Sequence, residues 1–284
     1  MAISAHTQLC GLIGNPVEHS LSPAIHNAAF QQLGLDFVYL AFKVENVPGA
    51  MQGLRSLGNL RGFSVTIPHK VAVMPYLDEI EPTAKNIGAV NTIVIDRGKL
   101  TGYNTDATGA VMALKQAGVS PDGRQILLLG SGGAARAIAF ALAAEPKVQG
   151  LCILGIDEAE RSRLVQDLRD RTPLAVEEGP LDERTLPRAI AAASVLIHAT
   201  PIGMHPKVAE SCVPANLLAP HLAVMDIVYN PRRTKLLQDA AANGCQTIEG
   251  LEMFLNQAVA QFELWTGRPA PVEVMRSVLE SRFS

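Results

Sequence analysis

The residue types best suited to chemistry in the first part of the chain stand at the ends of predicted strands. Ser20 and Ser22 lie two positions apart, after an apolar strand over 8–14 and just before a proline that starts a helix. Two hydroxyls at a helix N-terminus make a good seat for a carboxylate. The simpler alternative is that Ser22 only caps the helix.

A lysine and two further polar residues follow a similar arrangement. Lys70 comes just after the carboxyl end of a strand over 61–66, where a side chain can face a crevice. Asn91 and Asp106 belong to the next two polar clusters along the chain. Lysine, asparagine and aspartate from consecutive elements suit the recognition of a polyhydroxylated ligand. Lys70 on the open surface and Asp106 as a helix cap are the competing interpretations.

A glycine-rich loop supplies the clearest single motif. Residues 130–135 fit the pattern G-x-G-x-x-G/A, follow an apolar strand over 125–129 and open an alanine-rich helix over 133–144. The glycines let the backbone approach a pyrophosphate, and the helix N-terminus offers it free N–H groups. Flavin fits the loop alone, but one such unit in a chain of 284 residues favours a nicotinamide. We expect cofactor contacts from Gly130, Ser131, Gly132, Gly133 and Ala134.

The residue that follows the second strand of such a unit indicates which nicotinamide is bound. Asp157 occupies the position where an acid normally accepts hydrogen bonds from the adenosine ribose, and an acid there repels a 2′-phosphate. Arg161 and Arg163 offer an alternative site for that phosphate, but we interpret them as residues on the surface of the following helix. The sequence therefore favours NAD, although Asp157 also suits the N-cap of that helix.

Strands and helices must alternate along most of the chain to position these residues, a pattern typical of a parallel α/β sheet. The expected strands cover 8–14, 37–44, 61–66, 90–96, 99–104, 125–129, 150–154, 193–199, 222–227 and 247–248. The expected helices cover 23–34, 46–57, a segment from about 69, 106–117, 133–144, 158–170, 236–243, 250–265 and 271–282. Arg97-Gly98 reads as a tight hairpin turn.

The fold predicted from this order is α/β with two domains and the active site in the cleft between them. An N-terminal substrate domain with a mostly parallel sheet covers 1–105, and a Rossmann domain covers 106–244. The closing helices of 245–284 are expected to pack back on the first domain. Hinge closure is a further expectation for two domains around a crevice.

Composition excludes several classes of protein. Hydrophobic residues make up 48% of the chain and charged residues 18%, with a formal net charge of −3. The sequence contains no basic stripe, so no nucleic-acid partner is expected. We expect no membrane partner either, because no apolar run is long enough to span a bilayer and the start of the chain does not resemble a signal peptide. The expected location is the cytoplasm.

The cysteines and histidines do not predict a metal site. The chain has four cysteines, Cys10, Cys152, Cys212 and Cys245, and no two of them form a C-x-x-C motif. Small buried thiols are the simplest interpretation. His198 and His205 lack a cysteine or acidic partner in a ligand pattern.

The sequence resembles the shikimate dehydrogenase family over essentially its whole length. The motifs that carry the resemblance occur in the family's order, and their joint order is far more specific than any one of them. They are Ser-Leu-Ser-Pro at 20–23, Val-Thr-Ile-Pro-His-Lys at 65–70, Gly-Ala-Val-Asn-Thr at 88–92, Gly-Tyr-Asn-Thr-Asp at 102–106, the glycine loop, Ala-Thr-Pro-Ile-Gly-Met at 199–204, Asp-Ile-Val-Tyr-Asn-Pro at 226–231 and Gly-Leu-Glu-Met-Phe-Leu-Asn-Gln at 250–257.

The resemblance implies reversible hydride transfer between a nicotinamide and the 3-position of shikimate and 3-dehydroshikimate, in the shikimate (chorismate) pathway of aromatic amino acid biosynthesis. It implies that Lys70 and Asp106 form the catalytic pair. The implied substrate-binding residues are Ser20, Ser22, Thr66, Asn91, Tyr229 and Gln257. The implied cofactor-binding residues beyond the glycine loop are Thr200, within a loop from Ala199 to Ile202, with Ile227 and Gly250.

Three departures from the family's pattern bear on these expectations. Ser64 stands where many members have asparagine. Gly155-Ile156-Asp157 replaces the Asn-Arg-Thr of NADP-dependent members, so the arginine for a 2′-phosphate is missing and the family's usual NADP preference is in doubt. Ser22 favours shikimate, since relatives that prefer quinate often have threonine there.

Two alternatives stay open at this level. One is an NAD-dependent quinate/shikimate dehydrogenase of quinate catabolism, and the other is a non-catalytic nucleotide-sensing paralogue. Retention of both Lys70 and Asp106 argues against a sensor, which does not need proton-transfer chemistry. A purely structural role leaves the polar residues at strand ends unexplained. The oligomeric state is expected to be monomer or homodimer.

Overall fold

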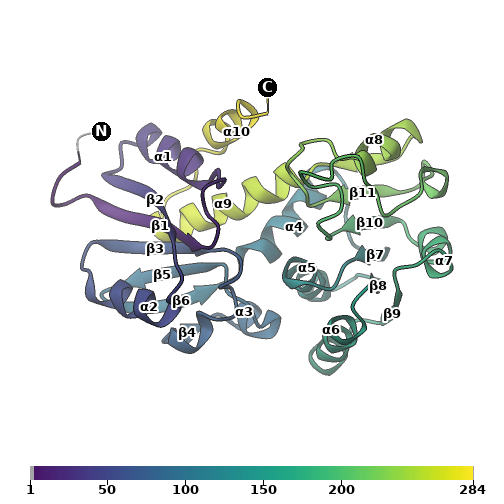
Figure 1. Ribbon diagram of the computed structural model, residues 1–284, viewed down its shortest axis with the longest axis horizontal. Coiled ribbons are helices and arrows are strands. Elements are labelled where there is room, and N and C mark those ends of the chain that lie inside the picture. The colour runs from purple at the N-terminus through teal and green to yellow at the C-terminus, as the bar shows by residue number, and fades with distance from the viewer. Residues whose placement is uncertain (1–2, 284) are drawn as a thin grey trace. The chain divides into compact units, whose positions relative to one another are not determined.

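The computed structural model describes residues 3–283 and divides into two compact units, each built on its own six-stranded sheet (Figure 1). The first unit contains the described residues up to Thr105 and those from Gln257 onward, and the second runs from Asp106 to Asn256. This division falls inside the last long helix, whereas the sequence places a boundary near Gly244.

The first unit has a mixed sheet with strand order β2-β1-β3-β5-β6-β4. Strand β1 pairs in parallel with β2 and β3, β5 runs antiparallel to both β3 and β6, and β4 is parallel to β6. Its elements are β1 Gln8–Gly14, α1 Ser22–Gln32, β2 Phe37–Lys43, α2 Val47–Ser56, β3 Leu60–Val65, a 3-10 turn η1 Met74–Tyr76, β4 Glu79–Ile80, α3 Pro82–Ile87, β5 Thr92–Asp96, β6 Lys99–Tyr103 and, from the C-terminal part, α9 Gly250–Thr266 from Gln257 onward and α10 Val272–Glu280.

The second unit has an all-parallel sheet with strand order β12-β11-β10-β7-β8-β9. This is the order of a doubly wound nucleotide-binding fold, with the switch point between β7 and β10. Its elements are α4 Thr105–Gln116 from Asp106 onward, β7 Gln125–Leu129, α5 Gly133–Ala144, β8 Gly150–Gly155, α6 Glu158–Arg171, β9 Val176–Pro180, α7 Thr185–Ala192, β10 Val195–His198, a 3-10 turn η2 Ala215–Leu217, β11 Ala223–Asp226, α8 Lys235–Ala242, β12 Gln246–Ile248 and the start of α9.

The expected hairpin turn is confirmed between β5 and β6. Arg97 and Gly98 both have positive φ angles, 48° and 80°, and connect the paired residues Asp96 and Lys99. Two central residues with positive φ are typical of the type I′ turn that two-residue hairpins favour.

Helix α9 contributes a large buried side chain, Trp265, to the first unit. This side chain is fully buried, and its indole nitrogen donates to the carbonyl of Ile93 at 3.0 Å. A Cβ at Gly62 on β3 would lie 2.0 Å from that nitrogen, so only glycine lets β3 pass beneath the ring. Helix α10 then packs on α1.

The helix expected from about 69 is wrong. Residues 66–73 form turns, in which the N–H of His69 donates to the carbonyl of Thr66 and that of Val73 to His69, and only the short η1 follows. The sequence also gave no indication of β4, α3, β9 or α7. Strand β9 carries two glutamates and a glycine, so it has no clear alternating pattern. Helix α7 is amphipathic, with Leu186 and Ile190 buried, but it has only 8 residues and a proline in its first turn.

Candidate active site

The serine pair lies at the start of α1. Ser22 is the first residue of the helix rather than its N-cap, and the N-cap position belongs to Leu21, which offers no capping side chain. The backbone N–H of Ser22 donates to Ser20 Oγ at 3.2 Å, so the two residues are in direct contact. No acidic residue occupies the first turn. The helix N-terminus therefore keeps its favourable field for an anion, and the capping alternative for Ser22 is wrong.

Thr66 and Lys70 are held by backbone hydrogen bonds at the carboxyl end of β3. The N–H of Thr66 donates to Ile13 on β1 at 2.9 Å. The carbonyl of Lys70 accepts from the N–H of Val90 at 2.8 Å. The carbonyl of Asn91 accepts from Val65 at 2.7 Å. These bonds bring the segment that carries Thr66 and Lys70 beside the one that carries Asn91.

The side chain of Asn91 is buried and rigidly oriented. Its Oδ1 accepts from the backbone N–H of Thr105 at 2.7 Å and from Thr92 Oγ1 at 2.8 Å. Its Nδ2 donates to Thr105 Oγ1 at 3.0 Å. Because the carbonyl end is occupied within the protein, the remaining amide N–H is the group that Asn91 can offer a ligand.

The two predicted catalytic residues belong to different units. Lys70 is half-buried in the first unit, and Asp106 is half-buried in the first turn of α4, at the start of the second. Gln257 is buried on α9, at the residue where the first unit resumes.

The glycine loop has the geometry that a dinucleotide requires. Gly130 has a φ of 113°, and a Cβ there would lie 2.6 Å from the carbonyl oxygen of Ala199 and 3.3 Å from Thr200 Cγ2. Only glycine fits this cradle, which joins the loop after β7 to the loop after β10. Gly132 is the N-cap of α5 and brings no side chain over the helix N-terminus. The residues present thus fit a bound pyrophosphate.

Comparison with known proteins agrees with this combination of units. A family model for the shikimate dehydrogenase substrate binding domain matches residues 12–93, and one for the shikimate 5'-dehydrogenase C-terminal domain matches 250–280. A curated relative from Desulforamulus reducens, named shikimate dehydrogenase (NADP(+)), is 45% identical over 99% of this chain and 98% of its own length. The chain belongs to the shikimate dehydrogenase family. It is therefore an oxidoreductase with a substrate-binding domain and a Rossmann domain.

Two solved structures are similar to this family member throughout. The shikimate 5-dehydrogenase of Listeria monocytogenes, solved in complex with shikimate and NAD, has 41% identity and a TM-score of 0.93, with 98% of each chain covered. The quinate dehydrogenase of Corynebacterium glutamicum, solved in complex with NAD, has 33% identity and a TM-score of 0.90, covering 97% of this chain and 99% of its own.

The region after β8 is more acidic than the sequence suggested. Asp157 is exposed and caps α6, since its Oδ1 accepts from the N–H of Glu160 at 2.8 Å. The carboxylate of Glu160 in turn accepts from Ser131 Oγ at 2.9 Å, which places a second acid on the glycine loop. That role of Glu160 was not predicted, because the contact joins residues from two separate loop–helix junctions.

Arg161 corrects another expectation. It is buried rather than on the helix surface, with Nη1 donating to the carbonyl of Gly155 at 2.9 Å and Nε to Glu178 at 3.1 Å. Arg163 is exposed, as expected of a surface residue. Arg161 is thus engaged by β8 and β9 inside the fold, and its guanidinium neutralises Glu178 rather than a ligand.

Two further predicted cofactor residues, Ile227 and Gly250, lie next to each other in the second unit. Gly250 begins α9 against the strand end at Ile227, and a Cβ at Gly250 would lie 2.5 Å from the carbonyl oxygen of Ile227. Tyr229 comes two residues after Ile227 in the chain and packs on Phe254, with the ring centroids 4.9 Å apart. Burial raises the pKa of the Tyr229 hydroxyl.

A buried polar network that the sequence did not reveal lies in the first unit. Tyr39 donates to Ser64 Oγ at 2.7 Å, Ser64 donates to Gln261 Oε1 at 2.9 Å, and Gln261 Nε2 donates to Thr92 Oγ1 at 2.9 Å. Thr92 continues the chain to Asn91. The departure from the family's asparagine at Ser64 was the one available signal for this network.

The described residues show neither a metal-ion cluster nor a membrane-spanning helix. Among residues 3–283, no group of three or more histidine, cysteine or acidic side chains is arranged to hold a metal ion. No helix in that range is long and apolar enough to cross a membrane. The four cysteines are unpaired, Cys10 and Cys245 buried and Cys152 and Cys212 half-buried.

Proposed function

We propose that this member of the shikimate dehydrogenase family interconverts 3-dehydroshikimate and shikimate with a nicotinamide cofactor, in the biosynthesis of aromatic amino acids. The observation that carries the proposal is the backbone bonding that fixes Thr66 and Lys70 beside Asn91 at the carboxyl end of β3. The proposed domains follow the sequence boundaries, with 1–105 and 245–284 holding the substrate and 106–244 holding the cofactor.

In the proposed site, Ser20 and Ser22 bind the substrate carboxylate at the N-terminus of α1. Thr66, Asn91 and Gln257 bind the ring hydroxyls and the reacting oxygen, with Tyr229 nearby; Asn91 does so through its remaining amide N–H. A bound nicotinamide supplies the hydride in the reductive direction and accepts it in the oxidative one.

Lys70 and Asp106 handle the proton in this proposal. When the ketone is reduced, its oxygen gains a proton from the pair, and the same pair takes the proton back when the alcohol is oxidised. Lysine is a cation that can hold the proton at the reacting oxygen, and aspartate can orient the ammonium and share its proton. The two groups act as one coupled acid–base unit.

For the cofactor we propose contacts from the glycine loop, Gly130 to Ala134, and from Asp157, Thr200, Ile227 and Gly250. We propose NAD as the better cofactor. The support is the acidity after β8, where Asp157 and Glu160 flank the ribose position and Arg161 is engaged inside the fold. A 2′-phosphate at that position would meet like charge.

The experiment that tests these proposals is a two-by-two steady-state assay of shikimate or quinate with NAD or NADP. Oxidation of shikimate with the higher kcat/KM for NAD is expected. A preference for NADP would refute the cofactor proposal alone. A preference for quinate would move the function to quinate catabolism, which the likeness to a quinate dehydrogenase keeps as the second candidate, while Ser22 favours shikimate. No reaction with either acid would support a nucleotide sensor.

Two further proposals concern the state of the protein in the cell. We propose a cytoplasmic location, which the unpaired state of all four cysteines supports, because thiols stay reduced there. We propose a monomer or a homodimer, which light scattering on the purified protein distinguishes.

A further inference from the structure

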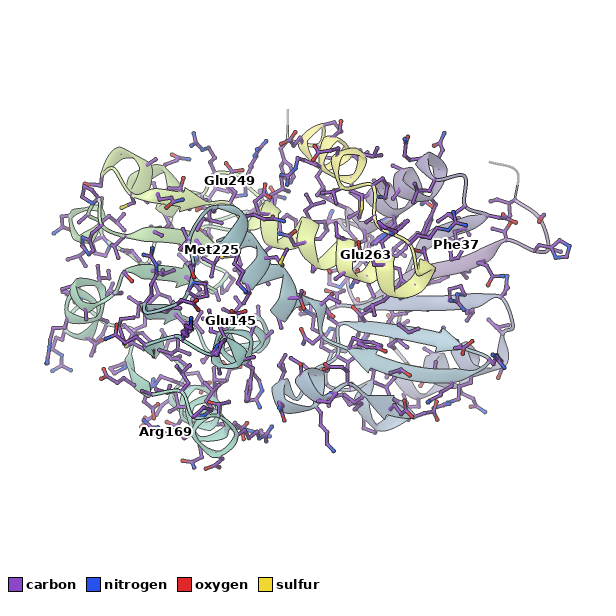
Figure 2. The ribbon with its side chains drawn as sticks, turned by 180° about the vertical axis from the view of Figure 1, so that it is seen from behind. Phe37, Glu145, Arg169, Met225, Glu249 and Glu263 are labelled. Atoms are coloured by element: carbon purple, nitrogen blue, oxygen red, sulfur yellow. The ribbon has the colours of Figure 1, made fainter. Side chains whose placement is uncertain are left out.

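A buried histidine–aspartate pair lies at the ends of two neighbouring strands of the second unit. His198 is the last residue of β10 and Asp226 the last of β11, and the two are partners in the parallel register. Figure 2 labels Met225, the residue before Asp226 on β11. His198 is 1% exposed and Asp226 is 0% exposed. His198 Nδ1 lies 2.8 Å from Asp226 Oδ1.

The Asp226 carboxylate only accepts hydrogen bonds, so it fixes how the imidazole is held. Besides His198, its Oδ1 accepts from the N–H of Val228 at 3.0 Å, and its Oδ2 accepts from Thr234 Oγ1 at 2.6 Å. A carboxylate with these donors requires His198 Nδ1 to carry a proton. The ring is thereby locked with its other nitrogen, Nε2, directed at Thr200 Oγ1.

Thr200 occupies the loop that meets the glycine motif. Its methyl group lies 3.3 Å from the Cβ position of Gly130, and its side chain is half-buried. Its hydroxyl oxygen contacts His198 Nε2 and also accepts from the N–H of Ile202 at 3.2 Å. When Nε2 is protonated, both lone pairs of this oxygen are used within the protein, and its own proton must go to an acceptor elsewhere.

We propose that His198 is a positioning residue that, held by Asp226, occupies the acceptor side of the Thr200 hydroxyl and so directs its proton at a pyrophosphate oxygen of the cofactor. This inference rests on the cofactor role proposed for Thr200. The pyrophosphate is the acceptor because Thr200 lies directly beside Gly130 of the glycine loop, whose missing side chain lets the loop after β10 pack against it. The same pair holds the backbone around Ile227 through Val228, so it supports two cofactor segments at once.

The protonation state of His198 agrees with this geometry. Burial lowers the pKa of His198, but its hydrogen bonds with Asp226 and Cys212 outweigh that effect and raise the pKa to about 9. Asp226 and Cys212 are the titratable groups that act on the ring. The residue paired with His198 on the other neighbouring strand, β7, is the apolar Leu129. Above this pKa, Nε2 becomes an acceptor and draws the Thr200 proton to itself. The donor to the cofactor is then lost.

Binding of NADH, followed by its fluorescence between pH 7 and 10, tests the inference without relying on turnover. Thr200→Val removes the hydroxyl but keeps the shape, and Thr200→Ser restores the hydroxyl. We expect the valine variant to bind NADH about 10-fold more weakly at pH 7, the scale of one hydrogen bond to a charged group. Wild type and the serine variant should lose affinity as the pH rises through about 9, whereas the valine variant should not.

Two further measurements keep the test sharp. Cys212→Ala should move the pH step to lower pH without removing it, because one contribution to the raised pKa of His198 is lost. Disappearance of the step would assign it to the thiol and overturn the inference. ADP-ribose, which has the pyrophosphate but no nicotinamide, should show the same Thr200→Val effect, and AMP should not.

The inference and the proposed function can fail separately. If wild type oxidises shikimate but Thr200→Val binds NADH and ADP-ribose as tightly as wild type, His198 does not act through Thr200. If neither acid is oxidised yet the pH step in NADH binding is present and depends on Thr200, the positioning role stands and the proposed reaction does not.

Discussion

The Tyr39 hydroxyl donates a hydrogen bond of 2.7 Å to Ser64 Oγ, and both side chains are buried. Ser64 can pass on only one proton, which it donates to Gln261 Oε1. The serine is therefore the central link between Tyr39 on β2 and the hydrogen bonds that run from Gln261 through Thr92 to Asn91. This link connects the core of the first unit to a proposed substrate-binding side chain.

Ser64→Ala should destabilise the protein by about 1–3 kcal/mol, because it leaves the Tyr39 hydroxyl and the Gln261 carbonyl without this buried partner. Urea unfolding measures the change. Tyr39→Phe removes only one donor and should cost less. The double variant should be less unstable than the sum of the two single ones, since removing both partners leaves fewer unpaired groups. Additive effects would show that the two hydroxyls do not act as a pair.

Lys70→Ala should lower kcat for shikimate oxidation by about 10²-fold or more, the scale of lost general acid–base help. NADH binding should change little, because Lys70 belongs to the unit without the glycine loop. Lys85→Ala is the matched control, an exposed lysine on α3 of the same unit. A Lys70→Ala enzyme with near-normal kcat would remove Lys70 from the mechanism.

Local signals in the sequence were sufficient for the elements around the cofactor. The apolar run of β7, the glycine loop and the alanine-rich α5 have the bounds expected from their residues alone. Each is encoded by neighbouring residues, through an apolar run, a positive φ that demands glycine and a strong helix former. The carboxyl-end position of Lys70 was predictable for the same reason.

The supporting contacts were not predictable because their partners are distant in the chain. The bond from Ser64 to Gln261 joins β3 to α9, and that from His198 to Asp226 joins β10 to β11. Arg161 lies on a helix whose charged residues suggest an outward-facing surface, and its partners on β8 and β9, the Gly155 carbonyl and Glu178, explain why it turns inward. Because β9 has no alternating pattern, the sequence does not predict the strand that carries Glu178.

Glu160→Gln should raise kcat/KM for NADP by about 2–5-fold relative to NAD, the scale of one exposed charge pair. The amide keeps the contact with Ser131 but removes the negative charge near the 2′-position. Glu158→Gln is the matched control, since Glu158 is an exposed acid in the same first turn of α6. Equal gains in both variants would mean that only the general charge of the helix matters, not the position of Glu160 on the glycine loop.

His26 should make the first unit sensitive to acid. The ring is fully buried and packs against Trp265. It also stacks on Tyr39, with the two ring centroids 4.6 Å apart. Burial lowers its pKa to about 3, with Gln261 opposing the change. The unfolded chain therefore binds a proton at this residue between about pH 6.5 and 3 while the folded protein does not, so stability falls as the pH drops through that window.

His26→Phe tests this directly, because phenylalanine keeps the ring packing and cannot be protonated. The free energy of unfolding in urea should fall by about 2 kcal/mol more in wild type than in the variant between pH 7.5 and pH 5, from 1.36 kcal/mol per pH unit below the unfolded pKa. His6→Phe, at an exposed position of the same unit, should leave the wild-type pH dependence unchanged. Parallel pH profiles for wild type and His26→Phe would show that the buried ring takes up its proton in the folded state, by local opening around α1.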